Sequence, residues 1–192
     1  MQAESVCEKN MVSLSEKQKF VIENLKDQEK MCVEKYQRGE AAAKDPELKE
    51  LFRSIGKEEQ QHYNSLDQLL HGTVVKVNTV DKAGTDYKPE AAYVGNFSQS
   101  DKENDKFLCT DSITTEKYVS SAYNFELFQF ADPDVRRLLN DIETEEQNLT
   151  ILLIFLPVFL PDRCGLSCIP QGVPFRIETF LKSDPQIQAR HF

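Results

Sequence analysis

The chain has 192 residues, of which 40% are hydrophobic, and a formal net charge of −9 at pH 7. This length is sufficient for one domain with a hydrophobic core and an appendage, and the composition is ordinary for a globular protein. We do not expect so acidic a chain, which lacks a basic stripe, to bind nucleic acid or an anionic membrane surface, because both kinds of binding depend on clustered lysine and arginine.

Four stretches of the chain carry hydrophobic side chains at steps of three and four residues, which is the period of an amphipathic helix. In chain order, the sequence predicts helices over about residues 15–44, 46–71, 112–131 and 133–156. We expect the first helix to begin with a capping box of Ser13 and Glu16. Gly72 is expected to end the second helix, and Pro157 the fourth.

Two Asp-Pro pairs, at residues 45–46 and 132–133, separate consecutive helices. In each pair the aspartate is suited to cap the helix that follows, and the proline to occupy its first turn. The residue before a proline avoids the helical region, so the preceding helix must end there. Each pair therefore predicts a tight turn between two helices, and hence a helical hairpin.

The chain repeats itself without a gap at a shift of 87 residues, the separation between Glu29 and Glu116. The same shift relates further pairs of residues: Tyr36 and Tyr123, Asp45 and Asp132, Ile55 and Ile142, and Glu59 and Glu146. Because the turn residues match as well as the helical ones, the sequence predicts two copies of one helix-hairpin unit, over about residues 15–72 and 107–156.

Residues 73–111 separate the two predicted hairpins, and this stretch is too long for an ordinary loop. Two hairpins of similar orientation need a connection that runs the length of the bundle, as in ferritin-like folds with one crossover. The predicted fold is therefore all-α: a ferritin-like four-helix bundle over residues 15–156, built from two hairpin repeats with one long crossover strap. Residues 1–14 would form an N-terminal extension.

One glutamate in each predicted helix lies in the seam that faces the core: Glu29, Glu59, Glu116 and Glu146. Buried carboxylates without partners are costly and repel one another, and a divalent cation is the usual compensation. His62 follows Glu59 by three residues, which places an oxygen and a nitrogen ligand on one helical face. Two glutamates plus two Glu-x-x-His pairs are the ligand set of di-iron and di-manganese bundles.

The sequence therefore predicts a metal site formed by Glu29, Glu59, His62, Glu116 and Glu146, suited to iron, manganese or zinc. Leu149 stands where a second histidine would be expected, so the second metal position should be the weaker one. We expect Glu59 to bridge to a second ion held by Glu116 and Glu146.

A simpler interpretation remains open, in which Lys30 or Lys117 forms ion pairs with these glutamates and no metal is bound. Tyr36 and Tyr123 lie one heptad beyond Glu29 and Glu116, which would allow a hydrogen bond to a ligand carboxylate. We interpret both tyrosines as ordinary aromatic core residues.

The second repeat contains four short motifs in a fixed order: Thr115-Glu116-Lys117-Tyr118, Tyr123-Asn124, Asp132 followed by Val135-Arg136-Arg137, and Glu145-Glu146-Gln147. In these motifs and their order, the chain resembles the spore coat protein F family of endospore-forming bacteria. The resemblance covers roughly residues 29–149 and implies a ferritin-like fold and association with the spore coat, without an established catalytic activity. Beyond Leu149 the resemblance ends, and we expect residues 157–192 to form an irregular tail that contributes little to the bundle.

Five cysteines are scattered along the chain without the spacing of a disulfide framework. Their odd number, together with an N-terminus that lacks the apolar run of a signal peptide, predicts synthesis in the reducing cytoplasm. Cys164 and Cys168 form only a weak zinc half-site. The apolar run over residues 151–160 is too short to span a membrane.

These features leave more than one function open. The first is a structural or interaction protein of the spore coat. Its partners would be other coat proteins or a second copy of the chain, in a homodimer. The alternative is an enzyme, a di-iron or di-manganese oxidase, ferroxidase or catalase. A third hypothesis is a cytosolic metal-storage or stress protein unrelated to spores.

Overall fold

The computed structural model describes residues 11–76 and 97–155 of the chain, and these residues form four long helices. In chain order they are α1 (Glu16–Ala42), α2 (Pro46–Leu70), α3 (Gln99–Glu126) and α4 (Pro133–Phe155), with a short 3-10 helix, η1 (Leu127–Gln129), after α3. None of the described residues lies in a strand. The predicted all-α class is confirmed.

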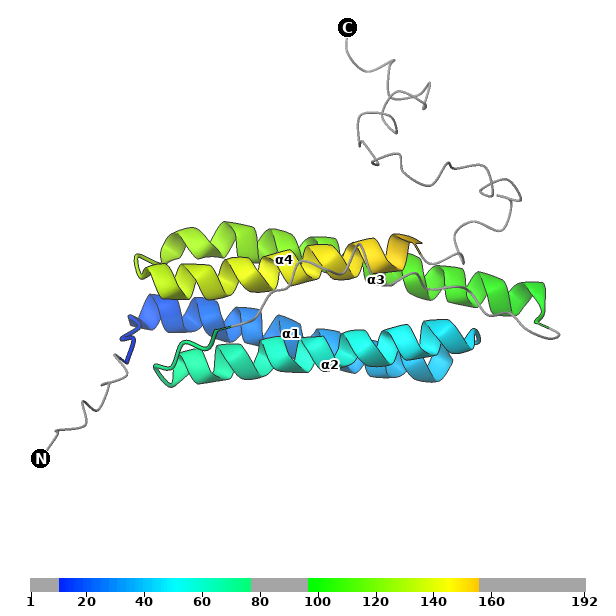
Figure 1. Cartoon of the computed structure of the whole chain (residues 1–192), viewed down its shortest axis with the longest axis horizontal. Coiled ribbons are helices and arrows are strands. Elements are labelled where there is room, and N and C mark those ends of the chain that lie inside the picture. The colour runs from blue at the N-terminus through cyan, green and yellow to red at the C-terminus, as the bar shows by residue number, and fades with distance from the viewer. Residues whose placement is uncertain (1–10, 77–96, 156–192) are drawn as a thin grey trace, which may run out of the picture. The chain divides into compact units, whose positions relative to one another are not determined.

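The helices are arranged as two hairpins, which we call the first hairpin (α1 and α2) and the second hairpin (α3 and α4). Within each hairpin the two helices run antiparallel and pack along their length (Figure 1). Across the hairpins, α1 contacts α3 and α2 contacts α4. The most extensive packing is therefore within each hairpin.

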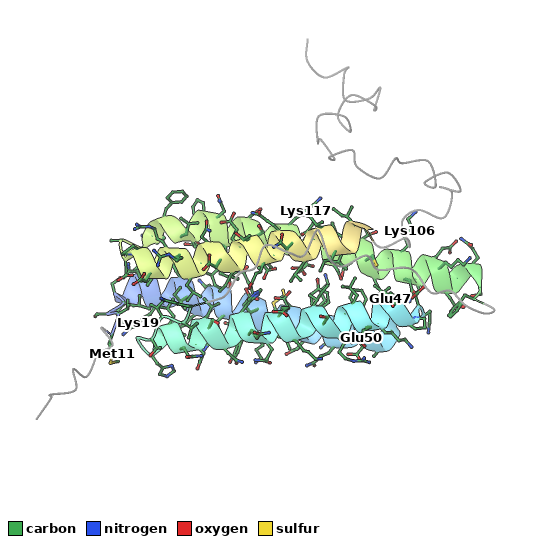
Figure 2. The ribbon with its side chains drawn as sticks, in the orientation of Figure 1. Met11, Lys19, Glu47, Glu50, Lys106 and Lys117 are labelled. Atoms are coloured by element: carbon green, nitrogen blue, oxygen red, sulfur yellow. The ribbon has the colours of Figure 1, made fainter. Side chains whose placement is uncertain are left out.

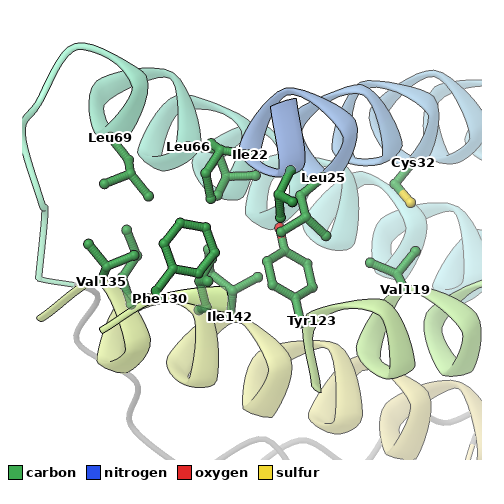
Figure 3. Close-up of a cluster of buried hydrophobic side chains, with 13 residues drawn as sticks. Ile22, Leu25, Cys32, Leu66, Leu69, Val119, Tyr123, Phe130, Val135 and Ile142 are labelled. Atoms are coloured by element: carbon green, nitrogen blue, oxygen red, sulfur yellow. The ribbon is translucent and has the colours of Figure 1, made fainter. Parts of the chain in front are cut away.

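The two hairpins share a hydrophobic core. Ile22 and Leu25 of α1 pack with Leu66 of α2, Tyr123 of α3 and Ile142 of α4 in one cluster of buried side chains (Figure 3). A second cluster, which includes Phe52, Ile55 and Leu153, lies further along the helices. Charged side chains such as Lys19, Glu50, Lys106 and Lys117 lie on the outside (Figure 2).

Both predicted Asp-Pro turns are present. The Asp45 side chain accepts hydrogen bonds from the backbone N–H of Glu47 at 2.8 Å and of Leu48 at 3.4 Å. The Asp132 side chain accepts equivalent bonds at 2.8 and 3.1 Å, at the start of α4. Each aspartate therefore satisfies backbone donors that the first helical turn leaves without a partner.

The first helix is capped at Ser15 rather than at Ser13, which corrects the expected capping box. The Ser15 side chain accepts from the backbone N–H of Gln18, and the Gln18 side chain bonds back to the backbone of Ser15. A glutamine at the third helical position closes such a box as well as a glutamate does. At the end of α2, Gly72 has φ of +82°, a value that favours glycine.

The third helix begins 13 residues earlier than the expected residue 112. Ser98 and Asp101 form a reciprocal capping box, and α3 continues from Gln99 to Glu126. Residues 99–111 are therefore helical and do not belong to a strap. The polar run that suggested a loop is instead an exposed first part of a helix. Three predicted regions lie outside the described residues: residues 1–10, residues 77–96 of the strap, and the tail with Cys164 and Cys168.

The start of α3 has a role in joining the hairpins. The buried carboxylate of Asp105 accepts hydrogen bonds from the backbone N–H groups of Lys44 at 2.8 Å and Asp45 at 2.7 Å, in the α1–α2 turn. In the other direction, Gln18 of α1 donates to the backbone carbonyl of Gln129 at 3.0 Å, in the α3–α4 turn. Gln18 and Asp105 are 87 residues apart, so corresponding residues of the two repeats each contact the turn of the opposite hairpin, although with different partner atoms.

Candidate metal centre

The five residues that the sequence predicts as metal ligands lie in the interior, between the two hairpins. Glu29, Glu59, Glu116 and Glu146 each come from the middle of a different helix, and all four are 0% exposed. His62, one turn after Glu59 on α2, is 1% exposed. The helical period brings each of them to the face that also carries the hydrophobic core residues of its helix.

Four of these five residues converge on one point. Glu29, Glu59, His62 and Glu146 each offer a ligand atom, and these atoms lie within 4.8 Å of one another. We call this group the carboxylate–histidine centre. Its members come from α1, α2 and α4, so the centre draws on both hairpins. Glu116 of α3 is not among the four converging residues.

His62 presents its two ring nitrogens to different environments. Nε2 lies 2.7 Å from Oε2 of Glu145, in a hydrogen bond. Nδ1 faces the carboxylates, 2.9 Å from Oε1 of Glu146 and 3.6 Å from oxygens of Glu29 and Glu59, without hydrogen-bond geometry. A carboxylate on one ring nitrogen, with the other nitrogen directed at a cluster of oxygens, is the arrangement that orients metal-bound histidines.

Glu145 contacts His62 of the centre, and the sequence interpretation missed it. It belongs to the triplet Glu145-Glu146-Gln147, which repeats Glu58-Glu59-Gln60, so the repeat contained a signal. The interpretation considered only the residues of the core seam. Glu145 lies one position off that seam, and its contact with His62 depends on how α2 and α4 pack together.

Two buried tyrosines cross between the hairpins to reach the glutamates. The hydroxyl of Tyr123 on α3 donates to Glu29 on α1, and the hydroxyl of Tyr36 on α1 donates to Glu116 on α3. Both tyrosines lie in the hydrophobic clusters, as expected for aromatic core residues, and each also makes the hydrogen bond to a glutamate that the sequence allowed. Close packing of α1 and α2 helps to place Tyr36, because a Cβ at Gly56 would lie only 3.3 Å from the Tyr36 Cβ.

The charged surroundings change the acidity of each group. Burial raises the pKa of Glu59 and Glu146 well above 4.5, and repulsion from neighbouring carboxylates raises it further. Burial alone would lower the pKa of His62, but its contacts with Glu145, Glu146 and the other glutamates raise it well above 6.5. The centre therefore favours bound positive charge, from protons or from a cation.

Most of the polar atoms at this position have no hydrogen-bond partner. In the described part of the chain, nine buried side-chain nitrogen and oxygen atoms are unpartnered, and seven of them belong to Glu29, Glu59, His62, Glu116 and Glu146. Lys30 and Lys117, which offered an alternative pairing, are exposed, and no described ion pair joins them to these glutamates. Leu149, at the position of a second histidine, is a buried core residue.

Cys32 also lies close to the glutamates, three residues after Glu29 on α1, and it is a free, buried cysteine. Burial and the negative charge of Glu59, Glu116, Glu29 and Glu146 raise the pKa of its thiol. The thiol is therefore neutral and a weak donor for a metal.

These features define an all-α protein with a buried carboxylate–histidine centre. Comparison with family models matches the Coat F domain over residues 104–150, which runs from α3 into the last turns of α4 and includes Glu116, Glu145 and Glu146. The resemblance noted for the second repeat is thereby confirmed over these residues. No curated protein and no solved structure matches the chain.

A search of the described helices for membrane spans finds none that is both long enough and apolar enough to cross a bilayer.

Proposed function

We propose that this chain is a structural protein of the spore coat, and that its two hairpins form a ferritin-like four-helix bundle whose core binds a divalent transition-metal ion. The Coat F domain supports the coat assignment. The helix order and the two-hairpin repeat support the ferritin-like assignment. The proposed role of the ion is to stabilise the folded bundle.

The observation that carries the metal proposal is the group of seven unpartnered polar atoms around the centre. Buried polar groups in folded proteins nearly always have partners, and each exception requires an explanation. A cation supplies one explanation for the six of these atoms that belong to Glu29, Glu59, His62 and Glu146, because carboxylate oxygens and an imidazole nitrogen are its ordinary ligands. Imidazole with carboxylates suits iron, manganese or zinc, and metal availability would decide among them.

In this proposal, Glu29, Glu59, Glu146 and Nδ1 of His62 hold the ion, and Glu145 orients the imidazole through Nε2. The ion would replace the mutual repulsion of the carboxylates with attraction. Its ligands come from α1, α2 and α4, so it would also link the first hairpin to the second. Binding to the folded state alone stabilises that state by about 2.7 kcal/mol when the free ion is at 100 times its Kd.

The direct test is thermal unfolding of the chelator-treated protein at increasing concentrations of Fe²⁺, Mn²⁺ or Zn²⁺. We expect the Tm of the wild type to rise with metal concentration. The double variant Glu59→Gln with His62→Leu should lose this response and still fold, because it removes buried charge and adds an apolar side chain. A matched control is Glu34→Gln with Gln37→Leu, which makes the same Glu→Gln change and introduces a leucine at the same spacing on the exposed face of α1.

The metal proposal is rejected if the wild type shows no response to any of the three ions and the double variant is destabilised. The enzyme alternative, a di-iron or di-manganese oxidase, ferroxidase or catalase, is tested on the same metal-loaded protein. Consumption of oxygen or peroxide with turnover would favour it over a stabilising role.

The coat proposal is tested by fractionating spores and probing the coat extract and the soluble fraction for this chain. Recovery from the coat extract is expected. Chemical crosslinking in that extract would then identify the partners, for which we propose other coat proteins or a second copy of the chain.

A further inference from the structure

A polar pocket is lined by residues of α2, by Glu145 of α4 and by Val75 and Lys76 of the segment after α2. This α2–α4 pocket has a volume of about 490 Å³. Two carboxylates, Glu58 and Glu145, line it together with amide and hydroxyl groups of α2, and Lys76 adds a positive charge. Of the residues that line it, the function proposed above uses only His62 and Glu145.

The pocket reaches the carboxylate–histidine centre through one side chain. His62 lines the pocket, although it is only 1% exposed. Its Nε2 bonds to Glu145, another residue of the pocket wall, while its Nδ1 faces Glu146 of the centre. The Glu145 side chain is 22% exposed and that of Glu146 is 0% exposed. The imidazole ring therefore stands between the pocket and the buried carboxylates.

The other directions from the centre are less suitable for an ion. The two hydrophobic clusters of the shared core lie on either side of it along the helix axes. A groove between α1 and α3 is lined by apolar and aromatic side chains and by four polar residues, and it includes no ligand of the centre; the polar residues are Asn24, Gln28, Ser121 and Glu126. Moving a hydrated cation past apolar side chains is costly. The α2–α4 pocket is the described cavity that combines carboxylates with a ligand of the centre.

We infer that the α2–α4 pocket is the uptake route of the metal centre: a hydrated divalent cation is first attracted by Glu58 and Glu145 and then reaches Nδ1 of His62 and the buried carboxylates by movement of the imidazole ring. This inference rests on the proposed metal binding. It assigns Glu145 as a positioning residue for His62, and it restricts the ligand of this pocket to small cations.

The test is the rate of Co²⁺ uptake by the full-length, metal-free protein, followed by stopped-flow absorbance, together with the equilibrium Kd. At low salt, Glu58→Gln should slow uptake about 3-fold and Lys76→Gln should accelerate it by about the same factor, because each changes the charge at the mouth of the pocket. Both effects should fade at high salt, while Kd changes little. Glu23→Gln, an equal charge change on the exposed face of α1, should leave the rate unchanged.

Glu145 requires a separate pair of variants. Glu145→Leu removes the partner of Nε2 and should weaken Co²⁺ binding about 10- to 100-fold and alter its absorption spectrum. Glu145→Gln keeps a hydrogen-bonding group and should restore most of the affinity. If neither Glu58→Gln nor Lys76→Gln changes the uptake rate of a protein that does bind Co²⁺, the uptake route is wrong and the metal centre stands. If the wild type binds no Co²⁺ at equilibrium, the metal centre itself is rejected.

Discussion

At the level of single residues, the buried glutamates depend on hydrogen bonds from neighbouring side chains. Glu29 and Glu116 are equivalent under the repeat, and each accepts a hydrogen bond from a tyrosine of the opposite hairpin. The seam positions of both glutamates follow from helical periodicity in the sequence. The tyrosine contacts do not, because they depend on the rotation of one hairpin against the other.

The two tyrosines permit a matched comparison. Tyr36→Phe and Tyr123→Phe each remove one hydroxyl from a fully buried ring, and each should lower the free energy of unfolding of the metal-free protein by about 1–2 kcal/mol. Only Tyr123 supports a glutamate of the centre, so Tyr123→Phe should weaken metal binding more than Tyr36→Phe does. Urea unfolding and metal titration of both variants measure the two effects. Equal losses of affinity would contradict this assignment.

The raised pKa values of Glu59 and Glu146 predict how the stability of the metal-free protein depends on pH. In the unfolded chain these groups lose their protons near the ordinary pKa of 4.5, whereas the folded protein retains them to higher pH. The unfolded state therefore binds fewer protons in this window, and the free energy of unfolding falls as pH rises above about 4.5. The raised pKa of His62 acts in the same direction above 6.5.

We therefore expect a lower urea midpoint for the metal-free protein at pH 8 than at pH 5.5. The double variant Glu59→Gln with His62→Leu should show a flatter dependence, since it lacks two of the titrating groups. A wild type whose midpoint is constant or rises over this range would show that these groups are not held in the buried state described above.

At the level of elements, the sequence predicted four helices and both turns because hydrophobic periodicity and Asp-Pro pairs are local signals. The start of α3 was missed because residues 98–106 are almost entirely polar. An exposed helical end has no apolar stripe, and here only the capping box of Ser98 and Asp101 marks it. The repeat offered a second signal, since the start of α1 shifted by 87 residues falls near residue 103.

The extended start of α3 is expected to contribute to stability through Asp105. Replacing Asp105 with alanine leaves the backbone N–H groups of Lys44 and Asp45 without this partner, and should lower the free energy of unfolding by about 2–3 kcal/mol. Gln18→Ala removes the contact that the corresponding residue of the first repeat makes with the other turn. This contact is a single neutral bond, and its loss should cost only about 1 kcal/mol. Chemical denaturation of both variants tests this order, and a larger loss for Gln18→Ala would refute it.

At the level of the whole molecule, the two hairpins are related by the 87-residue repeat in sequence, turns and cross-contacts. The symmetry fails at one position of the centre, where His62 of the first hairpin corresponds to Leu149 of the second. Leu149 is 6% exposed and packs in a hydrophobic cluster with Tyr36 and Ile55. The converging ligand atoms accordingly gather around His62, and Glu146 joins them although it belongs to the second hairpin.

This asymmetry predicts one strongly bound ion per chain rather than the two-ion arrangement that Glu59 would bridge. Leu149→His should supply the missing nitrogen ligand beside Glu116 and Glu146, and raise the number of Co²⁺ ions bound per chain from one to two. The metal-free variant should lose about 2–3 kcal/mol of stability, because a buried leucine is replaced by a polar group, and the second ion should restore part of it.

Leu153→His is the matched control for this change. It makes the same substitution one turn further along α4, at a position that is 0% exposed and away from the seam glutamates. It should be destabilised to a similar degree and still bind one ion. Equilibrium titration with elemental analysis of the loaded proteins gives the stoichiometry. Two ions in the wild type, or one ion in Leu149→His, would mean that the histidine missing from the second hairpin does not set the number of ions bound.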